Sequence, residues 1–187
     1  MGPLHERLGG GTVSGQVEFE LTYLASNLPP QLTSGPRRRI VDIYVPGDPR
    51  VHPRLRLRHD GDRFELTKKT PVTEGDASAH HESTIQLSAA EFDALASGDR
   101  RIEKWRYTAR VQDRTVEIDV FTGALTGLVL IDVEFSSRDD LEKFVPPTFF
   151  GPDVTHVDLI AGGLLAGRRY DDIAPALEQL AEGERHE

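Results

Sequence analysis

Strand-like alternation of polar and apolar residues runs through most of this chain. In about eight segments the alternation has a period of two, and β-branched and aromatic residues are frequent in them. The segments are residues 17–24, 37–45, 54–58, 63–69, 83–87, 102–111, 115–121 and 128–135. Helical patterns are short and lie at residues 87–96, 136–144 and 171–183. The sequence therefore predicts an α+β fold, with an eight-stranded antiparallel β-barrel and helices packed outside it.

Length and composition restrict the class of protein. The 187 residues favour one domain, which we expect at residues 16–183, with a flexible leader at 1–15 and a tail at 184–187. Hydrophobic residues make up 37%, which argues against wholesale disorder, and no apolar run is long enough for a membrane span. The lack of cysteine excludes disulfides and thiolate metal sites and fits a cytoplasmic protein. The net charge of −9 argues against nucleic-acid binding.

The charged residues of these segments follow the strand period, and each segment repeats one sign. Glu18 and Glu20 share one face of their strand, because side chains alternate between the two faces. The same spacing occurs in four further pairs: Arg56 with Arg58, Lys104 with Arg106, Glu117 with Asp119, and Asp132 with Glu134. Like charges this close repel each other, so each pair needs solvent or opposite charge beside it.

Two arrangements of these faces stay open at this point. They could be the solvent faces of an open antiparallel sheet. Alternatively, they point into a closed barrel, where each unpaired charge would cost roughly several kcal/mol. A polyanion bound together with a divalent cation would satisfy both signs, because arginine and lysine bind phosphate oxygens while clustered carboxylates bind Mg²⁺ or Mn²⁺. The inward arrangement therefore predicts metal-dependent hydrolysis of a phosphoanhydride.

Five motifs, in order, resemble those of the CYTH domain, a member of the triphosphate tunnel metalloenzymes. They are "EFELT", "LRLR" with "FELTKK", "HESTIQLS", "IEKWRYTARV" and "VEIDVFTGALTGLVLIDVEF". The resemblance implies an eight-stranded tunnel that binds Mg²⁺ or Mn²⁺ and a small-molecule triphosphate, either inorganic tripolyphosphate or an organic triphosphate. It also raises the expectation of a homodimer, since family members are often dimeric. From the net charge and the short apolar runs we expect no nucleic-acid partner and no membrane partner.

The resemblance also implies a role for individual residues. The metal ligands would be Glu18, Glu20, Asp132 and Glu134. The catalytic residues would be Glu18, Glu20, Asp119 and Glu134. The substrate-binding residues would be Arg39, Arg56, Arg58, Lys69, Lys104 and Arg106. Glu82 and Glu117 would belong to the acidic wall of the tunnel.

The chain departs from the family pattern at several positions. Thr22 replaces a lysine of the first motif, and Thr84 replaces the second glutamate of a later one. Arg39 or Arg54 could supply the missing charge. Residues 153–167 replace a segment that usually offers a basic or aromatic residue to the tunnel mouth. Separately, we expect the two histidines at residues 80–81 to lie in a solvated loop. A catalytically impaired protein that binds a phosphorylated ligand or a protein partner therefore stays open as the alternative to a hydrolase.

Overall fold

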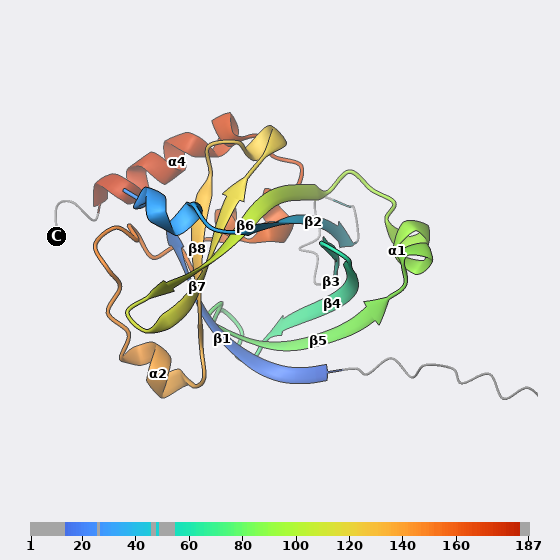
Figure 1. Ribbon diagram of the computed structural model, residues 1–187, viewed down its shortest axis with the longest axis horizontal. Coiled ribbons are helices and arrows are strands. Elements are labelled where there is room, and N and C mark those ends of the chain that lie inside the picture. Colours follow the sequence, from blue (N-terminus) through green and yellow to red (C-terminus); the bar gives the residue numbers. More distant parts are fainter. Residues whose placement is uncertain (1–13, 26, 46–47, 49–54, 184–187) are drawn as a thin grey trace, which may run out of the picture.

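Eight antiparallel strands form a closed barrel in the computed structural model, which describes residues 14–25, 27–45, 48 and 55–183 (Figure 1). Around the barrel the order is β1-β5-β4-β3-β2-β6-β7-β8. The strands are β1 (Ser14–Leu24), β2 (Arg37–Val45), β3 (Leu55–Asp60), β4 (Arg63–Pro71), β5 (Ala79–Leu87), β6 (Arg101–Val111), β7 (Arg114–Phe121) and β8 (Val129–Phe135). The predicted α+β barrel is confirmed, and closure leaves no sheet edge among these strands.

Short helices cover the outside and one end of the barrel. They are α1 (Ala89–Leu95), α2 (Arg138–Glu142), α3 (Gly162–Leu165) and α4 (Tyr170–Gly183), with 3-10 turns η1 (Pro30–Thr33), η2 (Gly123–Leu125) and η3 (Asp158–Ile160). The predicted capping box begins α1: the Ser88 side chain accepts from the Glu91 backbone N–H, and the Glu91 carboxylate accepts from the Ser88 N–H. Within the described residues, every helix is too short or too polar to cross a membrane.

The strand period decides which residues face inward. On β2, Arg38 and Asp42 line the central cavity, whereas Val41 and Ile43 pack outside against Phe92 of α1. A second outer core covers β1, β6, β7 and β8 and continues onto the segment after α2. The hydrophobic cores therefore lie outside the barrel and at one end of it, and the polar lumen lies between them.

Two strands start more than two residues before the position that the sequence predicts. Strand β5 starts at Ala79, so His80 and His81 belong to a strand and not to a loop. The polar run before Ser83 concealed this extension, because it has no clear alternation of polar and apolar residues. Strand β1 begins at Ser14 and pairs with β5 from there. The expected leader otherwise covers residues 1–13, and the expected tail covers 184–187, both of which lie outside the described residues.

Candidate functional site

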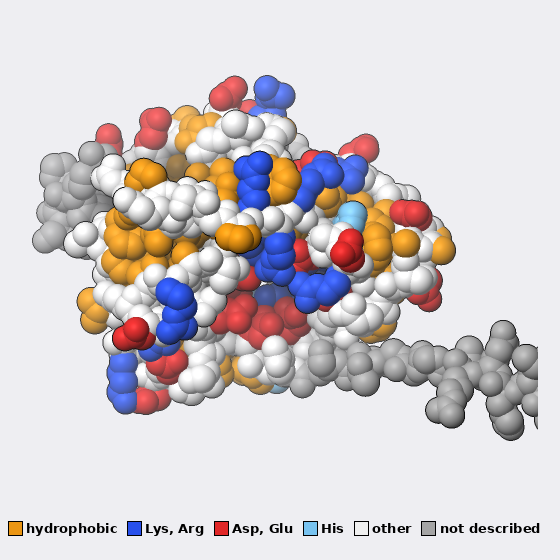
Figure 2. All heavy atoms as spheres, in the orientation of Figure 1, with side chains coloured by type: hydrophobic (Ala, Val, Ile, Leu, Met, Phe, Trp, Pro, Cys, Tyr) orange, Lys and Arg blue, Asp and Glu red, His pale blue; other side chains and the backbone are white. Residues whose placement is uncertain are grey.

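The barrel encloses a cavity of about 640 Å³ whose walls are mostly charged. This volume lies in the range of small-molecule sites, roughly 300–1,000 Å³. Figure 2 shows acidic and basic side chains facing each other across a hollow in this face of the molecule. The described residues contribute ten carboxylates to the lining: Glu18, Glu20, Asp42, Asp60, Glu65, Glu82, Glu117, Asp119, Asp132 and Glu134. They contribute seven cations: Arg38, Arg56, Arg58, Arg63, Lys69, Lys104 and Arg106.

On one side of the lumen, arginines of β3 meet a buried carboxylate of β2. Asp42 accepts hydrogen bonds from Arg58 Nε at 2.7 Å and from Arg58 Nη2 at 2.8 Å. Arg56 Nε lies 3.8 Å from the same carboxylate. Burial opposes the charge of Asp42, but the two guanidinium groups outweigh it and hold the pKa of Asp42 well below its usual range. This carboxylate is therefore ionised and holds two like-charged side chains close together.

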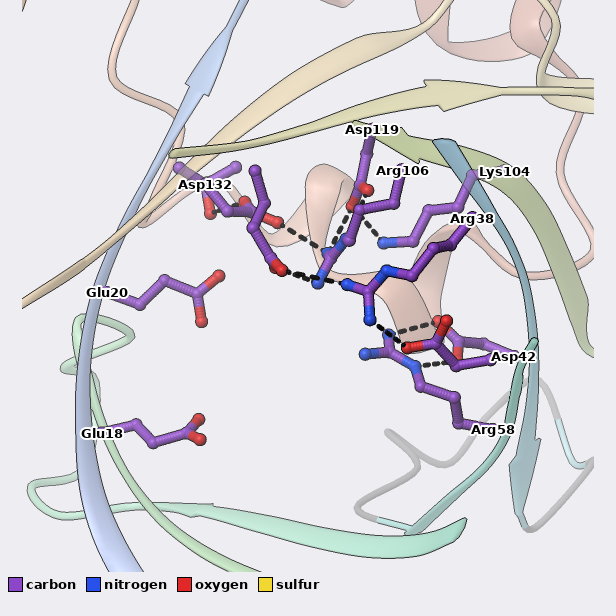
Figure 3. A network of polar contacts seen from close by, with 12 residues as sticks. Glu18, Glu20, Arg38, Asp42, Arg58, Lys104, Arg106, Asp119 and Asp132 are labelled. Atoms are coloured by element: carbon purple, nitrogen blue, oxygen red, sulfur yellow. Dashed lines mark hydrogen bonds and ion pairs between the residues drawn. The ribbon is translucent and has the colours of Figure 1, made fainter. Parts of the chain in front are cut away.

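A second buried cluster joins β6 to β7. Asp119, only 1% exposed, accepts from Arg106 Nε at 2.7 Å and Arg106 Nη2 at 2.6 Å, and it also accepts from Lys104 Nζ. Burial opposes its charge, yet Lys104 and Arg106 hold the pKa of Asp119 well below the usual range. Arg106 also reaches Asp132 Oδ2 on β8 at 3.2 Å, and it donates to Glu117. Figure 3 shows these side chains meeting in the upper part of the lumen.

We call the residues of these two clusters the paired wall: Asp42, Arg56, Arg58, Lys104, Arg106 and Asp119. Its carboxylates keep their charge because cations surround them. Thus the rows of like charge that the sequence shows are stabilised by rows of opposite sign on neighbouring strands.

Opposite the paired wall, β1, β5 and β8 contribute mainly carboxylates. Glu18 and Glu20 point from β1 across the lumen in Figure 3. Among the described residues, one cation lies close to both carboxylates. It is Lys69, whose Nζ is 2.8 Å from Glu18 Oε2 and 3.6 Å from Glu20 Oε2. Lys69 Nζ also lies 3.0 Å from Glu82 Oε2. One ammonium group therefore serves three carboxylates.

The acidic residues of β8 lie beside those of β1. Glu134 pairs with Glu20 in the strand register, and Asp132 pairs with Thr22, whose hydroxyl donates to Asp132 Oδ1 at 2.9 Å. Burial, Glu20 and Asp119 together raise the pKa of Asp132 to about 7. Burial and Glu117 also raise the pKa of Glu134, which forms no ion pair within the described residues. We call Glu18, Glu20, Asp132 and Glu134 the acidic wall.

The acidic wall has the donor chemistry that a divalent cation requires. Its oxygen ligands suit Mg²⁺ or Mn²⁺, and burial together with neighbouring carboxylates raises the pKa values of Asp132 and Glu134. Among the described residues, however, no three acidic or histidine side chains already converge on one point. A bound cation would therefore draw these carboxylates together, and their chemistry fits it.

The structure brings nearly all the predicted site residues into one lumen. The residues that line it are Glu18, Glu20, Arg56, Arg58, Lys69, Lys104, Arg106, Asp119, Asp132 and Glu134, together with Glu82 and Glu117. Arg39 does not join them. Its side chain is 57% exposed and is bound to Glu103 Oε2 at 2.6 Å, outside the barrel. Arg54 lies outside the described residues.

Several lining residues escaped the sequence prediction, among them Arg38, Asp42, Asp60, Arg63, Glu65 and His80. Arg38, not Arg39, faces the lumen, where Arg38 Nη1 lies 2.9 Å from Asp60 Oδ2. A signal existed, because Arg38 and Asp42 are four residues apart and therefore share a face. His80 also lines the lumen, as the extended β5 requires.

Comparisons with known proteins agree with this geometry. An inorganic triphosphatase from Nitrosomonas europaea is 41% identical over 104 residues, which are 54% of this chain and 66% of that protein. A solved structure of an inorganic triphosphatase is 31% identical, with a TM-score of 0.56, and the match covers 80% of this chain and 93% of that one. The chain belongs to the CYTH family of triphosphate tunnel proteins. No protein-family model matches the sequence.

The fold of the tunnel family also appears in more distant proteins. A solved structure from Bacillus halodurans, 18% identical, has a TM-score of 0.54 and matches 86% of this chain and 97% of that one. At this identity the likeness concerns the fold alone. In this CYTH-family chain, the family motifs correspond to lumen positions on seven of the eight strands: β1, β3, β4, β5, β6, β7 and β8.

Proposed function

We propose that this protein hydrolyses a triphosphate inside the barrel, with Mg²⁺ or Mn²⁺ held by the acidic wall. The observation that carries the proposal is a single lumen in which, among the described residues, seven cations face ten carboxylates. The cations can bind the oxygens of a polyanion, and the excess carboxylates would repel that polyanion without a metal. A triphosphate bound with a divalent cation satisfies both requirements. The similarity to inorganic triphosphatases supports the same reaction class.

In this proposal each wall has its own task. Glu18, Glu20, Asp132 and Glu134 hold the cation, which would orient the triphosphate and offset negative charge as the transition state develops. Arg56, Arg58, Lys69, Lys104 and Arg106 donate hydrogen bonds to phosphate oxygens. Their side chains already face one cavity, so little reorientation is needed when the substrate enters.

The reaction is an attack of water on phosphorus. The water oxygen forms a bond to the phosphorus, the bond from phosphorus to a bridging oxygen breaks, and orthophosphate and a diphosphate leave. We assign Glu134 the further role of general base, because it forms no ion pair within the described residues and desolvation and Glu117 raise its pKa. Asp119 is bound by Lys104 and Arg106, so we assign it to positioning these cations and not to the reacting atoms.

Phosphate release from tripolyphosphate tests the proposal. Purified protein with Mg²⁺ or Mn²⁺ should release orthophosphate, and Glu18→Gln and Glu134→Gln should each reduce kcat at least 100-fold, about 2.7 kcal/mol of transition-state stabilisation. The control Glu103→Gln changes a carboxylate bound to Arg39 outside the barrel and should leave kcat unchanged. Absence of turnover in the folded wild-type protein, with either metal, would contradict the proposal.

A further inference from the structure

One end of the barrel is filled by a hydrophobic core. Ile102, Phe121 and Leu130 face inward on β6, β7 and β8, each two residues along its strand from the charged lumen residues Lys104, Asp119 and Asp132. All three are at most 5% exposed. They belong to one core with Val154, Ile160 and Leu165 of the C-terminal segment. The charged lumen therefore ends at an apolar floor.

The segment that forms this floor, residues 152–166, is fixed to the barrel at several points. Val154 N–H donates to the Thr22 carbonyl at 2.8 Å, and Leu24 N–H donates to the Pro152 carbonyl at 2.9 Å. The segment thus continues the sheet beside the second half of β1, at a bridge between Tyr23 and Asp153. These backbone hydrogen bonds anchor the segment to the end of the barrel.

Two further contacts hold the floor against the inner wall. The buried Arg100, 6% exposed, donates to the Gly163 carbonyl and, at 2.7 Å, to the Asp48 carbonyl. Gly162 lies so close to β2 that a Cβ atom there would be 2.1 Å from the hydroxyl oxygen of Tyr44. A residue with a Cβ atom would collide with the wall here, so the backbone at Gly162 packs directly against Tyr44.

At the opposite end the lumen side chains are exposed. Arg38 and Arg63 are 42% and 57% exposed, whereas Asp42 and Asp119 deeper in the barrel are about 1% exposed. The hollow in Figure 2 is the opening at this end. Exposure thus falls from the opening toward the apolar floor, and the most buried ion pairs lie just above that floor.

We propose that the lumen is a blind cavity which admits a linear phosphate chain only by a free terminal phosphoryl group. The substrate class is then a polyphosphate with at least one unesterified end, and a triphosphate esterified at both ends is excluded. An ester group at the leading end would have to lie among Lys104, Arg106 and Asp119 or displace the floor. The ester group would separate Lys104 and Arg106 from Asp119 without offering them new partners. Leaving buried charges unpaired in this way costs free energy of binding. This inference rests on the proposed function for its substrate.

Three triphosphates test the inference on the wild-type protein. Tripolyphosphate has two free ends, ATP has one, and diadenosine triphosphate has none. With Mn²⁺, kcat/KM for diadenosine triphosphate should be at least 100-fold below that for ATP, and diadenosine triphosphate should not inhibit tripolyphosphate hydrolysis. Comparable rates for ATP and diadenosine triphosphate would overturn the blind cavity while leaving the hydrolase intact.

Binding separates the two proposals if turnover is absent. A metal-dependent rise in melting temperature with tripolyphosphate, and none with diadenosine triphosphate at equal concentration, would support the blind cavity in a protein that does not hydrolyse. Equal shifts with both compounds would overturn it. No shift with any of the three compounds would overturn both proposals.

A pair of neighbouring arginines offers a matched test of the floor. Arg100→Ala removes the side chain that holds Gly163, and Arg101→Ala removes an exposed side chain bound to Glu103. A folded Arg100→Ala protein should accept diadenosine triphosphate at least 10-fold better relative to ATP, and Arg101→Ala should keep the wild-type ratio. An unchanged ratio in folded Arg100→Ala would contradict the role of the floor. If this variant does not fold, the wild-type comparison decides.

Discussion

The paired wall and the acidic wall share one cavity but differ in charge balance. In the paired wall, cations from β3 and β6 surround Asp42 and Asp119 and hold the pKa of each below its usual range. In the acidic wall, burial and neighbouring carboxylates raise the pKa values of Asp132 and Glu134. This difference shows that the charges of the paired wall are balanced without a ligand, whereas the acidic wall lacks positive charge. The place for a divalent cation follows from this imbalance.

The largest effect is expected when the paired wall is broken. Asp119→Ala leaves Lys104 and Arg106 buried without their main counter-charge, so it should destabilise the protein by about 3–5 kcal/mol. Chemical denaturation measures this free energy of unfolding. The control Asp139→Ala breaks an exposed pair with Lys143 and should cost less than about 0.5 kcal/mol. If Asp119→Ala also cost less than about 0.5 kcal/mol, the paired wall would be solvated and the account of it would be wrong.

The two walls should respond to pH in opposite directions. The pKa of Asp132 is raised from 3.8 to about 7, so the stability it contributes is present at low pH and lost as pH rises through 7. The pKa values of Asp42 and Asp119 are lowered, so their contribution is present above 3.8 and lost as pH falls below it. Metal-free protein should therefore be most stable near pH 4, and its stability should fall by on the order of 1–3 kcal/mol between about pH 4 and pH 7.

Melting temperature between pH 3 and pH 9 in a chelator measures this profile. Mn²⁺ should raise the melting temperature more at pH 8 than at pH 5, because Asp132 is protonated at pH 5 and ionised at pH 8. Glu134→Gln should flatten the alkaline limb, and Glu142→Gln on α2 serves as an exposed control. Stability that increases steadily up to pH 9 without metal would contradict the imbalance of the acidic wall.

A smaller effect is expected at the contact between β1 and β8. Thr22→Val keeps the shape of the side chain but removes the hydrogen bond to Asp132 Oδ1, so it should cost about 1 kcal/mol at pH 8. Chemical denaturation at pH 8 and at pH 5 measures it. The cost should shrink at pH 5, where Asp132 is protonated, and an equal cost at both values would argue against a charge-assisted bond.

Much of the fold and of the candidate site follows from local pattern. Side chains alternate along every strand, so Glu18 with Glu20, or Lys104 with Arg106, had to share a face whatever the topology. The alternation did not show which acid meets which base. Asp119 meets Arg106 because β6 and β7 are paired, and Asp132 reaches the same arginine only because β8 follows. These contacts depend on barrel closure.

Two further features were missed from the sequence. The three arginines at residues 37–39 do not by themselves show which one faces inward, and only the four-residue spacing of Arg38 and Asp42 indicates that Arg38, not Arg39, faces the lumen. Residues 153–167 were interpreted only as lacking a basic or aromatic residue. Their packing with Ile102, Phe121 and Leu130 is a long-range contact, and single-sequence periodicity does not report such contacts.

The most direct test of the central claim measures whether the acidic wall needs a cation before the lumen can hold a triphosphate. Calorimetric titration with a non-hydrolysable imido analogue of tripolyphosphate, at pH 8, compares binding in Mn²⁺ with binding in a chelator. The account predicts at least 100-fold tighter binding with Mn²⁺, about 2.7 kcal/mol. Equal affinity in the two conditions would contradict it.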